Sequence, residues 1–221
     1  MFRLRKLKRK VRSLNRHSPK VFCVGMNKTG TTSVKCALEE LGYDVAPQAA
    51  AELMLEEWAK RDFRKLMRFC RRYNAFQDIP FSCPHTFLAL DQYFPNAKFI
   101  LTVRDSVDQW YESLGRFHSK ICQTQGLPNS EDLKNHSYHY PGYLWECHRF
   151  IYGVSEGQEY DEPIYKACYE QHNSSVVDYF RQRSDRLLVL NVAEDDSFCN
   201  LAGFLGVEVV DGSTFPWKNK T

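Results

Sequence analysis

Apolar residues follow two different spacings along this chain, and the alternation between them predicts the fold class. Short, nearly continuous apolar runs occupy residues 21–24, 98–103 and 186–192, as expected for strands buried on both faces of a parallel sheet. Elsewhere the apolar residues recur every three or four positions, which is typical of amphipathic helices. Because strands and helices alternate, we predict an α/β fold, a three-layer sandwich with a central parallel sheet.

Several segments carry the helical spacing. They are residues 34–41, 48–60, 62–73, 85–94, 159–183 and 197–205, together with a helix that contains Trp110. Gly42 and Gly206 follow two of these helices, where glycine readily takes the left-handed conformation that ends a helix. Residues 43–46 and 74–80 are predicted as further short strands, and the Arg/Lys run of residues 62–73 as a solvated face.

Residues 118–160 have no clean period and are rich in His, Tyr, Asn and Gly. We predict an irregular segment that forms a lid over a binding cleft. Its aromatic side chains either stack on a sugar or an aromatic compound or only pack the lid onto the body. They are Tyr138, Tyr140, Tyr143 and Trp145. The nearby His136, His139, Cys147 and His148 do not have the spacing of an ordinary metal site.

Charge is distributed unevenly between the N-terminus and the remainder of the 221 residues. Residues 1–17 carry eight Lys/Arg and no acid, which leaves 22 basic against 27 acidic residues, a charge of −5, for the rest. We interpret residues 1–17 as a flexible basic tail and residues 18–221 as one domain. The alternative for the tail is a helix, with Leu4 and Leu7 on its apolar face, in weak contact with a membrane surface or an acidic partner.

The basic start contains no apolar stretch of the length that a signal peptide or a membrane-spanning helix needs, so we expect a cytoplasmic protein. Eight cysteines are scattered through the chain without a C-x-x-C pair, which predicts buried thiols unless the chain resides in an oxidising compartment.

The strongest local signal is the sequence KVFCVGMNKTGTTS at residues 20–33. An apolar strand runs into a loop bracketed by Gly25 and Gly30 and then into a helix, and Lys28 adds a cation. The backbone N–H groups from Gly30 to Ser33 would lie at the helix N-terminus, where the partial positive charge favours an anion. We predict a phosphate-binding loop, the alternative being a strand-to-helix turn that has no ligand.

The loop differs from a Walker A loop, G-x4-G-K-[ST], because Thr31 follows Gly30 and the lysine precedes that glycine by two residues. The K-T-G-T-T arrangement after a strand resembles the 5′-phosphosulfate loop of the sulfotransferase family, which takes its sulfonate from 3′-phosphoadenosine 5′-phosphosulfate (PAPS). This resemblance implies a fold like that of the P-loop nucleoside triphosphate hydrolases. It also implies a set of donor-binding residues, namely Asn27, Lys28, Thr29, Gly30, Thr31, Thr32 and Ser33.

A second motif begins at Arg104, which directly follows the 98–103 strand and precedes a helix that contains Ser113. A guanidinium and a hydroxyl placed in this way can bind one phosphate together. The arrangement resembles the family's 3′-phosphate motif, although the interval is nine residues instead of eight and Asp105 stands where many members have Asn. The alternative is that Arg104 pairs with an acid. With the terminal F-P-x-x-N pattern, the resemblance covers residues 20–219.

Sulfonate transfer needs a cation at the leaving phosphate oxygen and a base at the acceptor hydroxyl. Lys28 is the candidate cation. We expect no metal, because the near match to a metal-binding strand ends in Asp105 beside the arginine. Asp78 is the candidate base, since the family resemblance places it at the histidine of a K-T-H-x-P stretch. Alternatively, Asp78 caps the helix near Pro84 or pairs with an arginine, leaving His85 and Glu112 as further candidates.

Three function classes follow from these motifs. The first is a PAPS-dependent sulfotransferase that acts, without metal, on a hydroxyl of a carbohydrate or a small molecule. The others are a P-loop kinase, which Thr31 at the Walker lysine position disfavours, and a non-catalytic nucleotide-binding protein. We expect no nucleic-acid partner, and the sequence leaves the oligomeric state open.

Overall fold

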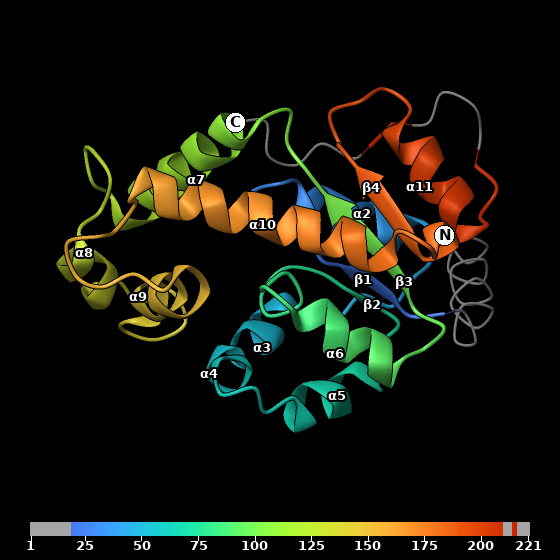
Figure 1. Ribbon diagram of the computed structural model, residues 1–221, viewed down its shortest axis with the longest axis horizontal. Coiled ribbons are helices and arrows are strands. Elements are labelled where there is room, and N and C mark those ends of the chain that lie inside the picture. The colour runs from blue at the N-terminus through green and yellow to red at the C-terminus, as the bar shows by residue number, and fades with distance from the viewer. Residues whose placement is uncertain (1–18, 210–213, 216–221) are drawn as a thin grey trace, which may run out of the picture. The chain divides into compact units, whose positions relative to one another are not determined.

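A parallel β-sheet is the centre of the protein in a computed structural model that describes residues 19–209 and 214–215. The sheet has four strands in the order β2-β1-β3-β4, and every neighbouring pair is parallel (Figure 1). Their bounds are Val21–Cys23 for β1, Ala75–Phe76 for β2, Lys98–Thr102 for β3 and Leu187–Leu190 for β4. The predicted α/β class with a central parallel sheet is therefore confirmed.

Strand β1 lies inside the sheet, between β2 and β3. Phe22 of β1 is in register with Phe76 of β2 on one side and with Phe99 of β3 on the other. The Phe22 ring stacks on Phe76 with a centroid distance of 4.7 Å. Since parallel strands end at the same edge of a sheet, the loop after β1 has the ends of both β2 and β3 as neighbours.

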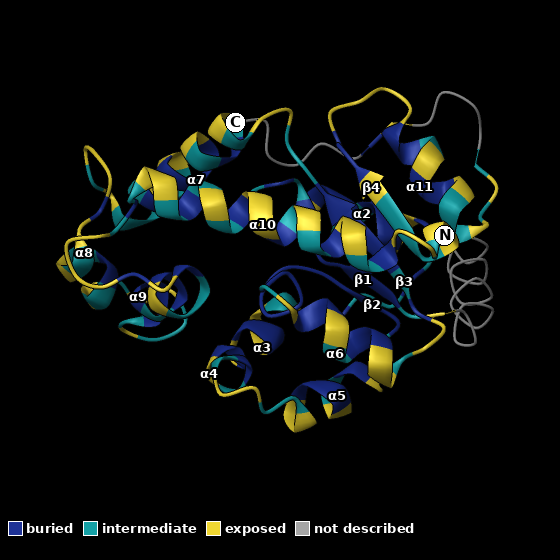
Figure 2. Ribbon diagram, viewed as in Figure 1, coloured by how far each residue is buried: buried dark blue, intermediate teal, exposed yellow. Residues whose placement is uncertain are grey.

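One face of the sheet is covered by α2 (Thr31–Glu40) and α11 (Ser197–Leu205). Alternate strand residues point to this face, among them Val21, Cys23 and Ile100, and they share one buried apolar cluster with side chains of both helices. Figure 2 shows how fully the strand β1 is buried. Helix α11 has the bounds that the spacing predicts.

The opposite face carries the intervening strand residues Phe22, Phe99 and Leu101, which belong to a second buried cluster. That cluster takes in side chains of three helices and confirms the three-layer arrangement. They are α5 (Arg64–Cys70), α6 (Thr86–Tyr93) and the last turn of α10 (Glu162–Phe180). Strands with large apolar side chains on both faces explain the continuous apolar runs in the sequence.

Three of the predicted elements are wrong in detail. The helix expected over residues 48–60 is divided into α3 (Gln48–Glu52) and α4 (Leu55–Ala59). The strand expected over residues 43–46 is reduced to a single bridge between Val45 and Ala75. The strand expected over residues 74–80 covers only Ala75–Phe76. In these places tertiary packing overrides a weak local preference.

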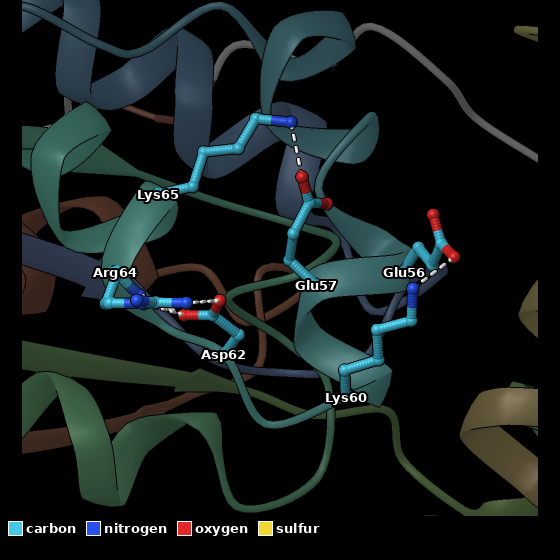
Figure 3. Close-up of polar contacts among 6 residues, drawn as sticks. All are labelled: Glu56, Glu57, Lys60, Asp62, Arg64 and Lys65. Carbon is cyan, nitrogen blue, oxygen red and sulfur yellow. Dashed lines mark hydrogen bonds and ion pairs between the residues drawn. The ribbon is translucent and has the colours of Figure 1, made fainter.

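Exposed ion pairs line the turn from α4 to α5 (Figure 3). They are Lys60–Glu56 at 2.6 Å, Arg64–Asp62 at 2.6 Å and Lys65–Glu57. Pairs of this kind contribute little to stability because water screens them. The Arg/Lys run is thus a solvated face, as predicted.

The chain divides into two compact units, which we describe separately. The first unit contains the sheet and takes in the described residues up to Val103 and from Val176 on, whereas the second contains Arg104–Ser175. The single domain over residues 18–221 stays a prediction, and the predicted tail at residues 1–17 lies outside the described residues.

The second unit contains all of residues 118–160, the segment predicted as irregular, and that prediction is wrong in part. Its elements are α7 (Val107–Cys122), α8 (Ser130–Asn135), α9 (Tyr143–Cys147), a π-helical turn (His148–Tyr152) and the part of α10 up to Ser175. Asn129 and Asp132 form a capping box that begins α8. Within residues 118–160, α8 and α9 are short and a π-turn follows them, so no sustained 3.6-residue period appears in the sequence there.

Candidate functional site

The loop between β1 and α2 needs its two glycines for different reasons. A Cβ atom at Gly25 would lie 2.1 Å from Thr102 Oγ1, so any side chain there would collide with β3. Gly30 has φ of 96°, in the left-handed region, and a Cβ atom there would meet Val192. Lys28, between them, also takes a left-handed conformation with φ of 70°. The backbone therefore bends tightly around the lysine.

Helix α2 begins directly after Gly30 and presents its N-terminal end to the loop. Gly30 is the N-cap residue and supplies no side-chain cap, and the first turn contains no acidic residue. The first N–H groups of an α-helix have no partner within the helix, and the helix dipole adds partial positive charge there. Backbone donors in this arrangement can bind an anion.

Asp78 joins this loop to the end of β2. Its Oδ2 accepts a hydrogen bond of 2.9 Å from the Thr31 hydroxyl, and its Oδ1 accepts one of 2.9 Å from the Ile79 backbone N–H. The N-cap residue of α6 is His85 and not Asp78. Of the roles that the sequence left open, the structure thus places Asp78 at the loop and does not place it at the helix N-terminus.

Burial makes Asp78 a weaker acid than an ordinary aspartate. The loss of hydration raises the pKa of its carboxyl, while the hydrogen bonds from Thr31 and Ile79 and the charge of Lys28 lower it in part. The Lys28 ammonium therefore acts on Asp78 electrostatically. A carboxylate with a raised pKa beside an anion site can accept a proton more readily than a solvated one.

The loop side chains differ in how far they are exposed. Thr29 and Thr31 are buried, at 0% and 3% exposure, and both hydroxyls are bonded inside the protein. Thr32 is exposed, whereas Asn27 and Lys28 are half-buried. Ser33 is buried at 9% exposure. Of the predicted donor-binding hydroxyls, the one on Thr32 is thus the most accessible.

A comparison with protein families decides which kind of protein this is. A family model described as Sulfotransferase domain matches residues 20–221. The chain belongs to the sulfotransferase family. A search of the curated proteins finds no match. As a member of that family the protein is a transferase enzyme that moves a sulfonate group.

In the second unit of this sulfotransferase, Arg104 is half-buried directly after β3. Its backbone N–H donates a 3.1 Å hydrogen bond to the Tyr169 hydroxyl, and the Tyr169 ring stacks on Trp110 at 4.5 Å. Burial lowers the pKa of the Arg104 guanidinium, which stays charged because an arginine pKa lies far above neutrality. Helices α7 and α10 thus hold the backbone of Arg104 through Trp110 and Tyr169.

Ser113 lies on α7 with 3% exposure, and its Oγ has no hydrogen-bond partner among the described residues. Buried hydroxyls are nearly always bonded, and an exception calls for an explanation such as a ligand. A phosphate oxygen is an acceptor that would satisfy it. Ser113, although nine residues after Arg104, can therefore still donate a hydrogen bond to a phosphate.

The two further base candidates of the sulfotransferase are both exposed. Glu112 pairs with Arg116 at 3.2 Å on the surface of α7, and His85 precedes α6. Neither has the buried surroundings of Asp78. They stay predictions.

An open groove of about 730 Å³ lies between α4, α5 and the end of α6. It is lined by Lys60, Arg61, Asp62, Phe63, Arg64, Met67, Arg68 and Tyr93. Lys60 and Arg64 pair with carboxylates, and Arg61 lies over the Trp58 ring at 4.7 Å. Most of its cations are thus engaged within the sulfotransferase itself.

Sequence reasoning did not identify Thr102 as part of the loop's surroundings. The Thr102 hydroxyl lies 2.5 Å from the Thr29 hydroxyl and 3.8 Å from Cys23 Sγ, and all three residues are fully buried. The signal that could have identified it is a threonine within the apolar run of residues 98–103.

Within residues 19–209 and 214–215, no helix is long and apolar enough to span a bilayer. The same part of the chain contains no group of three or more His, Cys, Asp or Glu side chains that could hold a metal ion. The eight cysteines all lie in it and form no disulfide.

Proposed function

We propose that this sulfotransferase takes its sulfonate from PAPS and transfers it to a hydroxyl group of a carbohydrate or small molecule. The observation that carries the proposal is the N-terminal end of α2. It follows Gly30 without a side-chain cap or an acidic residue in the first turn, and Lys28 lies in the loop just before it. Helix N–H groups and a cation together suit the 5′-phosphosulfate end of the donor.

The 3′-phosphate is the feature that separates PAPS from an ordinary adenine nucleotide. We assign it to Arg104 and Ser113. The guanidinium can bind two phosphate oxygens at once, and the buried Ser113 hydroxyl retains a hydrogen bond to donate. A phosphate oxygen would satisfy the Ser113 hydroxyl, which has no partner among the described residues.

In the transfer step, the acceptor oxygen forms a bond to sulfur while the bond between sulfur and the leaving phosphate oxygen breaks. Lys28 and the loop N–H groups stabilise the negative charge that the leaving oxygen gains. Asp78 is proposed to accept the proton of the acceptor hydroxyl, a role that its raised pKa supports. Adenosine 3′,5′-bisphosphate and the sulfated acceptor are then the products.

Asp78 has a second role open to it, because its Oδ2 already accepts a bond from Thr31. In that role the carboxylate holds the loop and does not touch the acceptor. Loss of the carboxylate and loss of the Thr31 hydroxyl would then lower kcat equally.

The direct test is the transfer of labelled sulfonate from PAPS to a panel of sugars and small hydroxyl compounds. Calorimetry with adenosine 3′,5′-bisphosphate and with AMP reports on the donor site separately. We expect much tighter binding of the bisphosphate. Equal affinities would favour a kinase-like site, and tight binding without transfer to any acceptor would favour a non-catalytic nucleotide-binding protein.

The acceptor, the role of the predicted lid at residues 118–160, weak membrane contact through the N-terminus, the absence of nucleic-acid partners and a cytoplasmic location stay predictions. The acceptor panel bears on the first two of these. A variant in which an exposed tyrosine such as Tyr138 is changed to alanine should raise the KM for the acceptor and leave donor affinity unchanged.

A further inference from the structure

Three buried side chains and one backbone carbonyl form a chain of hydrogen bonds beneath the loop. The Thr29 hydroxyl donates to the Met26 carbonyl at 2.6 Å and lies 2.5 Å from the Thr102 hydroxyl. Cys23 Sγ lies 3.8 Å from the same Thr102 oxygen. This series of hydrogen bonds thus connects β1, β3 and the loop.

The number of protons fixes the direction of these bonds. A hydroxyl has one proton to donate, and Thr29 gives its proton to Met26, so Thr102 must donate to Thr29. Thr102 is then left as an acceptor for the Cys23 thiol. That sulfur keeps its proton, since burial raises the pKa of the Cys23 thiol to about 12. Each hydroxyl in the chain both donates and accepts.

These bonds hold the segment that surrounds Lys28. Met26 and Thr29 flank Asn27 and Lys28, so the bonds at Met26 and Thr29 pin the backbone on both sides of the lysine. Lys28 itself has a left-handed φ of 70°, a conformation that a lysine takes only when its surroundings impose it. Thr102 also contacts the loop's first glycine, Gly25, where no Cβ atom would fit.

We propose that Thr102 is a positioning residue, which sets the place of the Lys28 ammonium by holding Thr29. The Thr29 hydroxyl then stabilises the conformation of the loop, and PAPS contacts Thr29 only at its backbone N–H. The proposal rests on the proposed function of Lys28 at the leaving phosphate.

If the side chain at position 102 only packed against its neighbours, an apolar residue would fill the position equally well. Thr102 follows the three buried apolar residues of β3, Phe99–Leu101, and is itself fully buried. Valine has the shape of threonine without the hydroxyl, so Thr102→Val removes the hydrogen bonds and keeps the packing volume. Thr102→Ser keeps the hydroxyl and loses a methyl group.

Thr86 is a matched control in the same unit. It is also fully buried, and its hydroxyl donates a 2.9 Å bond to the Pro80 carbonyl. Thr86→Val therefore removes a buried hydroxyl of the same kind without touching Thr29. A general loss of stability would affect Thr86→Val and Thr102→Val alike.

The experiment compares Thr102→Val, Thr102→Ser and Thr86→Val at a temperature at which all are folded. We expect Thr102→Val to lower kcat by on the order of 10-fold to 100-fold, because small displacements of a catalytic group are costly. Thr102→Ser and Thr86→Val should stay within a few-fold of the unaltered protein. Equal kcat losses in Thr102→Val and Thr86→Val would overturn the proposal.

Hydrogen exchange of the loop amides gives a readout that needs no substrate. Thr102→Val should speed the exchange of amides at residues 26–31, and Thr86→Val should not. A Thr29→Val variant removes the other hydroxyl of the same bond. The double variant Thr29→Val/Thr102→Val should exchange its loop amides little faster than either single variant. Full additivity in the exchange rates would show that the two hydroxyls act independently and overturn the proposal.

These measurements separate the proposal from the function on which it rests. If the unaltered protein neither binds adenosine 3′,5′-bisphosphate nor transfers sulfonate, the proposed function fails, whatever the exchange rates are. If it does both and Thr102→Val has normal kcat, the function stands and the positioning role fails.

Discussion

The Thr31 hydroxyl donates a 2.9 Å hydrogen bond to Asp78 Oδ2, which joins the first residue of α2 to the segment after β2. Both side chains are buried, at 3% and 8% exposure. The bond brings a carboxylate with a raised pKa to the edge of the loop between β1 and α2. Whether that carboxylate takes a proton or only holds Thr31 can be decided with two variants.

Asp78→Asn keeps the shape of the side chain and removes its basicity. If Asp78 is the general base, kcat should fall by about 10² or more, while the affinity for adenosine 3′,5′-bisphosphate stays near that of the unaltered protein. Thr31→Val, which removes only the hydrogen bond to Asp78, should lower kcat much less. Steady-state kinetics and calorimetry on both variants give the answer, and equal losses of kcat would assign Asp78 a positioning role.

Lys28→Gln removes the cation and keeps a side chain of similar length in the left-handed conformation. We expect kcat to fall by about 10²–10³, since one electrostatic partner of the leaving oxygen is lost. Because the lysine is proposed to neutralise this oxygen, turnover should persist in excess EDTA. A strict requirement for added Mg²⁺ would contradict that assignment and favour a kinase.

Ser113→Ala should have opposite effects on stability and on donor binding. The change removes a buried hydroxyl that has no partner among the described residues, so thermal unfolding should occur at the same or a slightly higher temperature. The affinity for adenosine 3′,5′-bisphosphate should fall about 5-fold to 10-fold, equivalent to roughly 1 kcal/mol. The affinity for AMP, which lacks the 3′-phosphate, is the internal control. A parallel loss for both nucleotides would remove Ser113 from the 3′-phosphate site.

Arg104→Gln tests the charged partner that we propose for the 3′-phosphate. It should reduce the preference for the bisphosphate over AMP more strongly than Ser113→Ala, because a charged, two-pronged contact is lost. Calorimetry at two salt concentrations checks the result. The preference of the unaltered protein should weaken at high salt, whereas that of Arg104→Gln should depend little on salt.

His148 should make the protein less stable in acid. Burial lowers the pKa of this imidazole to about 3, and its Nδ1 bonds the Tyr165 hydroxyl within an aromatic cluster that includes His118 and Tyr160. Between pH 6.5 and 3 the unfolded chain binds a proton that the folded chain does not. The free energy of unfolding therefore decreases as the pH is lowered through this window. The contribution of His148 to that decrease is roughly 2 kcal/mol between pH 7 and pH 5.

Urea unfolding at pH 7 and pH 5 measures that loss. The loss should be smaller in His148→Gln, which does not titrate, and unchanged in His85→Asn, which alters an exposed histidine. An unchanged loss in His148→Gln would show that other groups cause the acid sensitivity.

Much of the architecture was decided by local sequence. The apolar runs at β1 and β3, the helix Ser197–Leu205 and the glycine-bracketed loop could be predicted because their signals lie within a few neighbouring residues. Strands buried on both faces and turns that require left-handed backbone constrain the residue types directly. The fold class and the conformation of this loop follow from these constraints.

Tertiary structure decided how the loop is held. Thr31 and Asp78 are 47 positions apart in the chain, and Thr29 and Thr102 are 73 apart. Such pairs meet only because β2 and β3 flank β1 in the folded sheet, and no local pattern encodes that arrangement. The same holds for the division of residues 48–60 and for the helices of residues 118–160, where packing against distant side chains outweighs the small free-energy differences of local propensity.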